Sequence, residues 1–527
     1  MRNKCALLLL LLMCMGKVIY AQELCPVIPL PNYFKNTNEI CKLDNNTRLI
    51  VKEPAFKTTA DFLQQQVQRY TSITIATQKS KKGISIVFKK ENNNSTKGVY
   101  KLRMTGKQIT ISAANEEGAF YGAVSLLQII AQSAIVDDVL SMQCWNLQDA
   151  PVYEWRGFML DESRHFFGKE KVKQILDMMA FYKLNRFHWH LTDEPAWRLE
   201  IKQYPFLALK GGMGNSTDSF APAKYYSQTD ITEIVNYAQA LHITIIPEVD
   251  MPGHATAANK AYPQYSGGGS KGHPAFTFNP GKEETYQYLS NILKEVNELF
   301  PSKMIHLGGD EVSFGNNEWE NDPAIQRLMK NEKLINNTEV EQYFIKRMAD
   351  SIVKLNSTVV GWDEIANSNL SPDKTIVFWW RQEAPEQLKK ALAKKFPVVL
   401  CPRLPLYFDF VQDSTNKVGR RWNGKYNSPE KVYAFSHEQY PEAVANRNLI
   451  LGIQANLWTE TVSTEKRLDY LMFPRLCALA ETAWTEPSKK DYKQFEQRLQ
   501  KHLLLLKQKG IYYYDPINPR ETPEVRR

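Results

Sequence analysis

Residues 283–311, EETYQYLSNILKEVNELFPSKMIHLGGDE, contain the repeating unit of this fold. Residues 283–300 have the spacing of an amphipathic helix, and residues 304–308 form an apolar run of strand length. Two glycines and two carboxylates, Asp310 and Glu311, come next. A helix followed by a short apolar strand that ends in polar residues is typical of an α/β fold with parallel strands.

The same unit recurs after Pro151. Strands are predicted at residues 157–161, 186–191, 243–249, 304–308, 359–362, 376–379, 398–401 and 450–454. Helices are predicted at residues 169–184, 231–241, 283–300, 339–355 and 386–395. Eight β-then-α units in about 330 residues predict a (β/α)8 TIM barrel with long loops. An open, doubly wound sheet is the alternative, but no G-x-G-x-x-G motif follows any strand, which argues against its dinucleotide-binding form.

The regions around the barrel are predicted to form a small domain and a tail. Residues 22–150 are expected to be an α+β domain, with strands at 84–88, 100–104 and 108–112, helices at 59–70 and 118–132, and a loop at 92–95. The barrel is expected to span residues 151–490. Residues 491–527 would then be a C-terminal helix and tail.

The first residues of the chain resemble an export signal. Arg2 and Lys4 precede an apolar run at residues 6–15, and Ala21 is a small residue at which cleavage is expected. The run is too short to cross a bilayer as a helix. A signal peptide at residues 1–21 predicts a secreted or periplasmic protein, whereas Met13 before Cys14 is a poor match for a lipid-anchor site.

Charge and cysteine content exclude several classes of protein. The 527 residues are 43% hydrophobic and carry a formal charge of +9, three units of which lie in the predicted signal peptide. Because the remaining charge is spread along the chain, nucleic-acid binding is not favoured. Five cysteines remain after the signal peptide, without a CxxC spacing, which argues against a zinc site and a dense disulfide framework. One bridge between Cys25 and Cys41 and buried free thiols are the two alternatives.

Polar and aromatic residues follow every predicted barrel strand. They are Asp161 with Arg164, Asp193 with Glu194, Glu248 with Asp250 and His254, Asp310 with Glu311, Trp362 with Asp363 and Glu364, Trp380 with Arg381, Tyr407 with Asp409, and Trp458 with Glu460. A barrel of this type carries its chemistry at the carboxyl ends of its strands. Carboxylates and arginine bind sugar hydroxyls, and aromatic rings stack on a pyranose. A single strand-end carboxylate is more often a cap or an ion-pair partner, but eight loops together indicate a sugar site.

Seven segments resemble the β-N-acetylhexosaminidases of glycoside hydrolase family 20. They are GFMLDESRHFF (157–167), FHWHLTDEPAWRLEI (187–201), IPEVDMPGHA (246–255), HLGGDE (306–311), GWDE (361–364), LYFDF (406–410) and ANLWTE (455–460). The segment ANEEGAFYGAVSLLQ (114–128) resembles the small N-terminal domain of that family. HLGGDE after a strand, together with HWHLTDE, is highly specific, whereas GWDE alone is weak.

The resemblance implies a retaining mechanism in which the 2-acetamido oxygen of the substrate is the nucleophile. Glu311 would be the general acid/base. Asp310 would accept a hydrogen bond from the acetamide N–H, and Tyr407 would donate its hydroxyl to the acetamide carbonyl. Adjacent residues of a strand face opposite ways, so both carboxylates reach one ligand only where the strand has ended, as Gly308 and Gly309 permit.

The resemblance also implies which residues surround the sugar. Trp362, Trp380 and Trp458 would form the walls of the acetamide pocket, and Trp380 is chosen over Trp379 because Arg381 follows it. The sugar hydroxyls and the acid would be served by Arg164, Asp409 and Glu460 and by a dyad of Asp193 and His254. His190 and His306 are expected to be supporting or core residues.

These residues predict an exo-acting enzyme that removes terminal, non-reducing β-linked N-acetylglucosamine or N-acetylgalactosamine from an oligosaccharide or glycoconjugate. No metal or organic cofactor is implied. A disaccharide-releasing lacto-N-biosidase and a non-catalytic glycan-binding protein are the alternatives. Asp409 and Glu460 favour release of a monosaccharide, and an intact Asp310–Glu311 pair favours catalysis. The loop residues 267–269 and Arg420-Arg421 are candidates for a leaving-group subsite.

Overall fold

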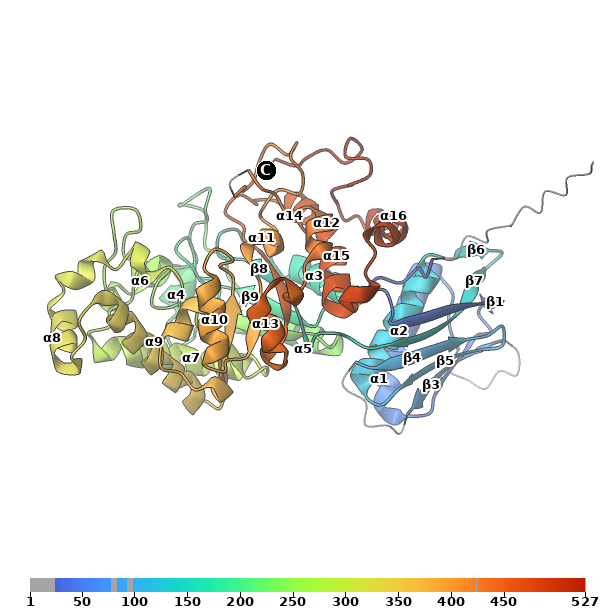
Figure 1. Ribbon diagram of the computed structural model, residues 1–527, viewed down its shortest axis with the longest axis horizontal. Coiled ribbons are helices and arrows are strands. Elements are labelled where there is room, and N and C mark those ends of the chain that lie inside the picture. Colours follow the sequence, from blue (N-terminus) through green and yellow to red (C-terminus); the bar gives the residue numbers. More distant parts are fainter. Residues whose placement is uncertain (1–23, 77–82, 92–97, 423, 527) are drawn as a thin grey trace, which may run out of the picture.

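The computed structural model describes residues 24–76, 83–91, 98–422 and 424–526, which form two domains (Figure 1). The predicted signal peptide and the predicted loop at 92–95 lie outside the described residues. The first domain is one mixed sheet of strand order β1-β7-β4-β5-β3-β2, with β6 paired to β7. Its elements are β1 (Tyr33–Leu43), β2 (Arg48–Val51), β3 (Ser85–Lys90), β4 (Tyr100–Met104), β5 (Gln108–Ala113), β6 (Ala134–Val136), β7 (Val139–Asp149), α1 (Lys57–Thr71) and α2 (Glu116–Ala131).

The predicted α+β domain is therefore confirmed, but sequence patterns located only three of its seven strands. β4 shows why it was found: Tyr100, Leu102 and Met104 are buried and alternate with exposed residues. β1 shows why it was missed. Most of its residues are at least partly exposed, and a register shift between Asn36 and Ile40 interrupts its pairing with β7, so no clean alternation appears.

The second domain is a closed barrel of eight parallel strands, and the predicted TIM barrel is confirmed. The strands are β8 (Trp155–Asp161), β9 (Arg186–His190), β10 (Thr244–Glu248), β11 (Met304–His306), β12 (Thr358–Trp362), β13 (Thr375–Trp379), β14 (Val398–Leu400) and β15 (Ile450–Leu457). Pairing of β8 with both β9 and β15 closes the ring, which excludes the open-sheet alternative.

Helices surround the barrel, as Figure 1 shows. The five predicted ones are α3 (Lys169–Phe181), α5 (Gln228–Ala240), α7 (Glu283–Leu299), α9 (Asn337–Lys354) and α10 (Pro385–Ala393). Helix α5 begins where Ser227 and Asp230 form a reciprocal capping box. The others are α4 (Phe206–Leu209), α6 (Thr256–Ala261), α8 (Pro323–Glu332), α11 (Arg403–Leu406), α12 (Pro429–Ala434), α13 (Pro441–Ala445), α14 (Glu465–Met472), α15 (Arg475–Trp484) and the C-terminal α16 (Tyr492–Gln508).

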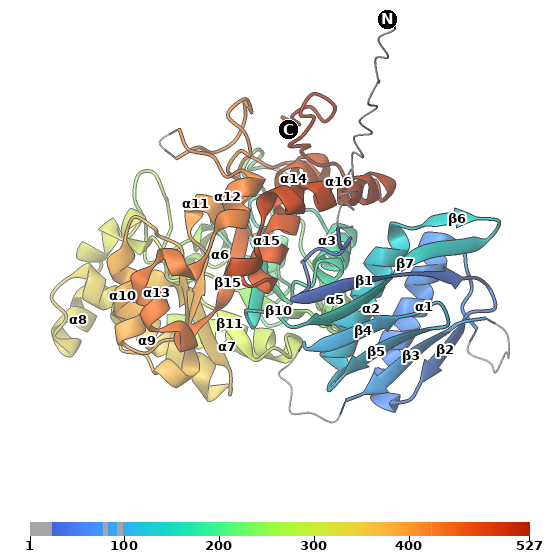
Figure 2. The ribbon, with the colours of Figure 1, turned by 45° about the vertical axis from the view of Figure 1, so that its right-hand side comes forward.

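The two domains meet along α2, which lies between the sheet and the barrel (Figure 2). This position explains why α2 is buried on nearly every side. Asp149 joins the domains, because Tyr100 and Trp484 donate hydrogen bonds to it and Lys183 lies 3.3 Å away. Glu481, on α15, likewise pairs with Arg498 of α16 at 2.6 Å.

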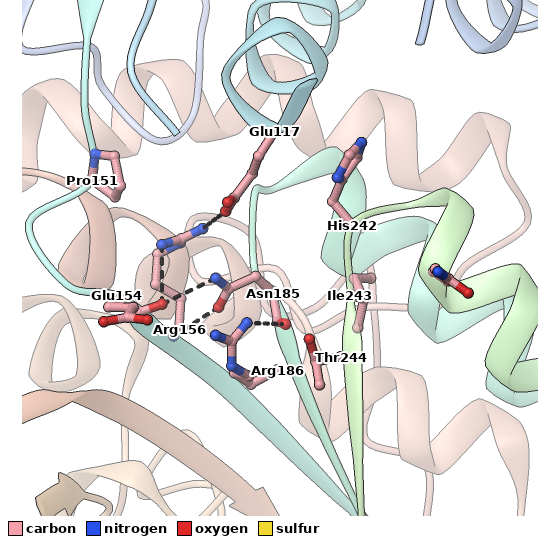
Figure 3. A pocket seen from close by; sticks show the side chains of 10 residues that line it. Glu117, Pro151, Glu154, Arg156, Asn185, Arg186, His242, Ile243 and Thr244 are labelled. Atoms are coloured by element: carbon pink, nitrogen blue, oxygen red, sulfur yellow. Dashed lines mark hydrogen bonds and ion pairs between the residues drawn. The ribbon is translucent and has the colours of Figure 1, made fainter. Parts of the chain in front are cut away.

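A cleft of about 660 Å³ opens at this junction. Figure 3 shows Glu117 of α2 facing Arg156, Asn185 and Arg186, which lie near the amino ends of β8 and β9. This is the end of the barrel opposite the predicted site, because the predicted site residues follow the carboxyl ends of the strands.

The five cysteines that follow the predicted signal peptide are all buried and free. The possible Cys25–Cys41 disulfide is therefore not formed, and the alternative of buried thiols holds. Burial raises the pKa of the Cys25 thiol to about 12, which keeps it protonated and unreactive. Among the described residues, no helix is both long and apolar enough to cross a membrane.

Candidate active site

Ten of the eleven predicted site residues line one pocket of about 110 Å³. They are Arg164, Asp193, His254, Asp310, Glu311, Trp362, Trp380, Tyr407, Trp458 and Glu460. The eleventh, Asp409, is buried beside the pocket, with Oδ2 3.5 Å from Nε of the lining residue Arg420. The residues come from loops after different strands, so the barrel brings together positions that are far apart in the sequence.

The backbone after β11 lets two adjacent carboxylates reach this pocket. The strand ends at His306, and Gly308 and Gly309 then adopt φ angles of +72° and +89°. A Cβ atom on Gly308 would lie 1.8 Å from Oδ1 of Asp250, so only glycine fits there. Glu311 itself is left-handed, with φ of +53°. Because of these turns, the side chains of Asp310 and Glu311 do not point to opposite sides as they would in a strand, and both line the pocket.

His254, one member of the predicted dyad, lies between Asp193 and the two carboxylates of Asp310 and Glu311. Its Nδ1 donates to Oδ1 of Asp193 at 3.0 Å, and its Nε2 is 3.6 Å from Oδ2 of Asp310 and 3.8 Å from Oε2 of Glu311. Burial alone would lower the pKa of His254, but Asp193, Asp250 and Asp310 raise it well above its usual range. The ring therefore presents a positive charge to both carboxylates.

Burial and neighbouring charges shift the pKa values of the carboxyl groups of the site in different directions. Burial alone would raise the pKa of Asp193, but Arg164 and His254 hold it well below its usual range. Burial raises the pKa of Asp310 to about 7, against the opposing effect of His254. Burial also raises the pKa of Asp409 to about 7, although Arg420 opposes it. Asp193 is thus held ionised, whereas Asp310 and Asp409 titrate near neutrality.

Aromatic side chains enclose the pocket. The ring of Tyr407 lies parallel to that of Trp380, with centroids 6.4 Å apart, and Trp362 contacts Trp458 at 5.8 Å. Trp379 points elsewhere: it packs against Tyr440 and is fully buried outside the pocket lining. The structure therefore brings Trp380 rather than Trp379 into the pocket.

Two arginines complete the lining. Arg420 lies 2.6 Å from Glu460 through Nη2. Arg403 places its guanidinium over Trp380 and Trp422, at 4.7 and 4.0 Å from the ring centroids. Sequence reasoning named Arg420 only as a leaving-group candidate and missed Arg403, although its position just after β14 was the available signal. Residues 267–269, the other loop candidate, are outside the lining.

Three groups in the described part of the chain have ligand atoms close enough together for a metal ion. They are His188–Glu248–His306, Asp193–Glu194–His254 and Asp250–His254–Asp310. The first two have short nitrogen–oxygen contacts, such as 3.0 Å between His306 Nδ1 and Glu248 Oε1. In the second group, the 3.0 Å contact between His254 Nδ1 and Asp193 Oδ1 is a hydrogen bond. The expectation of a metal-free site stays a prediction.

The barrel and its pocket of carboxylates and aromatic rings define a sugar-type site at the usual end of a TIM barrel. The sequence profile described as "Glycosyl hydrolase family 20, catalytic domain" matches residues 153–487. The profile "Glycosyl hydrolase family 20, domain 2" matches residues 24–150. The chain therefore belongs to glycosyl hydrolase family 20, and the predicted family is confirmed.

Individual relatives agree with the family. The chain is 33% identical over 507 residues to a beta-hexosaminidase of Porphyromonas gingivalis, covering 93% of this chain and 64% of that protein. An exo-β-N-acetylglucosaminidase of Vibrio harveyi, solved with N-acetylglucosamine, is 31% identical with a TM-score of 0.85, over 93% of this chain and 78% of that one. A β-N-acetylhexosaminidase of Bacteroides fragilis is 29% identical with a TM-score of 0.80, over 92% and 96%.

Proposed function

We propose that this chain is an exo-acting, retaining β-N-acetylhexosaminidase that removes terminal, non-reducing β-linked N-acetylglucosamine or N-acetylgalactosamine. Glu311 gives its proton to the glycosidic oxygen while the acetamide oxygen of the substrate attacks the anomeric carbon. The departing sugar leaves with that proton, and a cyclic oxazolinium forms. Glu311, now a carboxylate, takes a proton from water as the water opens the ring.

One observation carries the proposal. Asp310 and Glu311, neighbours in the chain, both face His254 across less than 4 Å at a pocket walled by three tryptophans and Tyr407. Asp310 is nine-tenths buried, whereas about a third of the Glu311 side chain is exposed. This difference fits Asp310 to hold a buried acetamide and Glu311 to exchange protons with solvent.

The aromatic enclosure supports participation of the acetamide. Trp362, Trp458 and Tyr407 are more than nine-tenths buried, so a group between them is screened from water. The Tyr407 hydroxyl is a donor for a carbonyl oxygen on which charge develops. Burial raises the pKa of Tyr407 well above its usual range, which keeps that proton in place.

The charged residues support recognition of a single sugar. Arg164 is held by Asp193 at 2.6 Å and stacks over Trp458, so its remaining donors are oriented. Asp409 and Glu460 are bridged by Arg420, which lines the pocket of about 110 Å³. A narrow pocket favours one terminal residue over the disaccharide that a lacto-N-biosidase would need to admit.

We also propose that the protein is secreted or periplasmic, on the basis of its first 21 residues. Detection of the mature chain outside the cytoplasm, with its amino terminus beyond residue 21, would test this. The cofactor expectation is tested separately by assaying activity after dialysis against a chelator, where full activity is expected.

The activity is tested with p-nitrophenyl β-N-acetylglucosaminide and its galactosamine epimer. We expect turnover of both, and proton NMR should show the β-anomer of the free sugar first, because two inversions retain configuration. Glu311→Gln should reduce turnover of unactivated oligosaccharides by about 10³-fold. Initial release of the α-anomer, or a Glu311→Gln enzyme within a few-fold of wild type, would refute the mechanism.

A further inference from the structure

A second polar cluster lies inside the barrel, next to the pocket, around the carboxylate of Glu248. His190 Nδ1 donates to Oε2 of Glu248 at 2.6 Å, and Trp362 Nε1 donates to Oε1 at 2.9 Å. His306 Nδ1 is 3.0 Å from Oε1, and His188 Nε2 is 2.9 Å from Oε2. Four side chains from strands β9, β11 and β12 thus converge on one fully buried carboxylate.

The barrel register explains this convergence. Glu248 is the last residue of β10, and it is paired with His190 on β9 and with His306 on β11. Side chains at matching levels of a barrel interior form one layer. Such layers are normally filled by branched apolar residues. Here three interior positions next to the pocket are held by the ionisable side chains of Glu248, His190 and His306.

Stability gives little reason to keep such a layer. Removing a carboxylate from water costs several kcal/mol, and apolar residues of similar volume are often as stable or more stable. The histidines of the cluster also differ in their protonation state. Burial lowers the pKa of His188 to about 4, so that ring is neutral. Burial alone would also lower the pKa of His190, but Glu248 and Asp193 raise it well above its usual range.

The contacts continue from Glu248 into the pocket in two directions. In one, His190 Nε2 donates to Oδ2 of Asp193 at 2.9 Å, and Asp193 holds His254 beside Asp310 and Glu311. In the other, Glu248 holds the indole edge of Trp362, whose ring lines the pocket. Glu248 does not line the pocket. It nevertheless contacts His190, which holds Asp193, and Trp362, which forms part of the aromatic wall.

We propose that Glu248 is a positioning residue, which fixes the Asp193–His254 dyad through His190 and fixes the pocket wall through Trp362. Glu248 does not meet the substrate. It orients groups that line the pocket, so its loss lets the Asp193–His254 dyad and Trp362 shift together. The inference rests on the proposed function, since it assigns these contacts a role in that reaction.

Glu248→Gln is the direct test, because it preserves shape but places an N–H₂ group against the histidine and tryptophan donors. A displacement of about 1 Å in a catalytic group costs on the order of 10²-fold in rate. We therefore expect kcat to fall about 100-fold while KM changes less than about threefold. The double variant Glu248→Gln with His190→Gln should be no slower than the slower single variant, because both substitutions break the same path.

Glu481→Gln is the matched control. Glu481 is equally buried and accepts from Arg498, Tyr433 and the Leu30 amide, but it lies at the domain junction. Its substitution should lower the melting temperature and leave kcat of the folded enzyme unchanged. If Glu248→Gln behaved like this control, the proposal would be wrong. Independent, multiplying losses in the double variant would also overturn it.

Two further measurements keep the test decisive. If Glu248→Gln does not fold, His190→Gln alone must reproduce the fall in kcat at near-constant KM. If the wild-type enzyme does not hydrolyse the glycosides, the proposed function fails separately. In that case, indole ¹⁵N–¹H spectra test the contact between Trp362 and Glu248 directly. The chemical shift of the Trp362 indole N–H should change in Glu248→Gln and not in Glu481→Gln. A Trp362 signal unchanged by Glu248→Gln would refute the inference.

Discussion

The cavities at the two ends of the barrel differ in volume and in how fully their buried polar atoms are hydrogen-bonded. The cleft at the amino ends is the larger, about 660 Å³ against about 110 Å³ at the carboxyl ends. In the cleft, Arg156 donates to the carbonyls of Tyr153 and Lys183 and to the Tyr121 hydroxyl (Figure 3 shows its position). Among the described residues lining the small pocket, Arg164 Nη1, His254 Nε2, Asp310 Oδ1 and Arg403 Nε are buried without a hydrogen bond.

The difference shows that volume is a poor guide to the site in this molecule. Buried polar atoms without partners cost stability, and a protein keeps them where a ligand can satisfy them. At the amino end, Arg186 Nε is the one such side-chain atom among the described lining residues. We therefore expect substitutions at the carboxyl end to change turnover and those at the amino end to change stability.

The largest expected effect is that of Asp310→Asn. The amide lacks the charge that we propose stabilises the forming oxazolinium, and we expect kcat to fall by about 10²- to 10³-fold. The same substitution removes a buried charge close to Glu311 and Asp250, so the melting temperature should not fall. Steady-state kinetics and calorimetry check both parts.

Asp149→Asn is the matched substitution at the other end of the barrel, where the carboxylate is satisfied by Tyr100, Trp484 and Lys183. It should lower the melting temperature and leave kcat unchanged. The contrast between the two ends fails if Asp310→Asn is the more destabilised of the two, or if Asp149→Asn loses most of its turnover.

The pH dependence should be set by the small pocket. Burial raises the pKa values of Asp310 and Asp409 to about 7, and the proposed mechanism uses both as carboxylates. As pH falls through 7 these groups take up protons, so kcat/KM should fall by about tenfold per pH unit for each. The acid limb should therefore be steeper than one decade per unit. In Asp409→Asn it should return to one decade, and an unchanged slope would exclude Asp409 from the limb.

A smaller effect is expected for Tyr407→Phe. Phenylalanine keeps the parallel packing on Trp380 but removes the proposed donor to the acetamide carbonyl, so kcat should fall about 10- to 100-fold. Tyr121→Phe is the control at the amino end, where the hydroxyl accepts from Arg156 and donates to Glu117. It should reduce stability alone. Equal kinetics for the two variants would remove Tyr407 from the mechanism.

Some features of this molecule could be predicted from its sequence and others could not, and the reasons are physical. The barrel was predictable because its strands are short, mostly buried runs, and five of the eight are followed by a helix of amphipathic spacing. The edge strand β1 was not, because most of its residues are at least partly exposed and its pairing with β7 is interrupted by a register shift. For the site, residues directly after strands could be located, and ten of eleven line one pocket.

What the sequence did not reveal were contacts between distant loops. Arg420 joins Asp409 and Glu460 only through the folded loop that follows β14. Glu248 was visible as a strand-end carboxylate, but its place among three histidines depends on the register between strands. No local pattern encodes that register.

The smallest effect on turnover is expected for Arg156→Met, which tests the amino end most directly. The substitution leaves the carbonyls of Tyr153 and Lys183 without their buried donor, and the free energy of unfolding should fall by about 2–4 kcal/mol. Arg186→Met, which removes a single hydrogen bond to the Asn185 carbonyl, should cost less than about 1 kcal/mol. Urea unfolding measures both. Because neither residue reaches the small pocket, kcat should stay within twofold of wild type in both variants. A kcat loss in Arg156→Met that exceeds its loss of folded protein would mean that the two ends are coupled through β8.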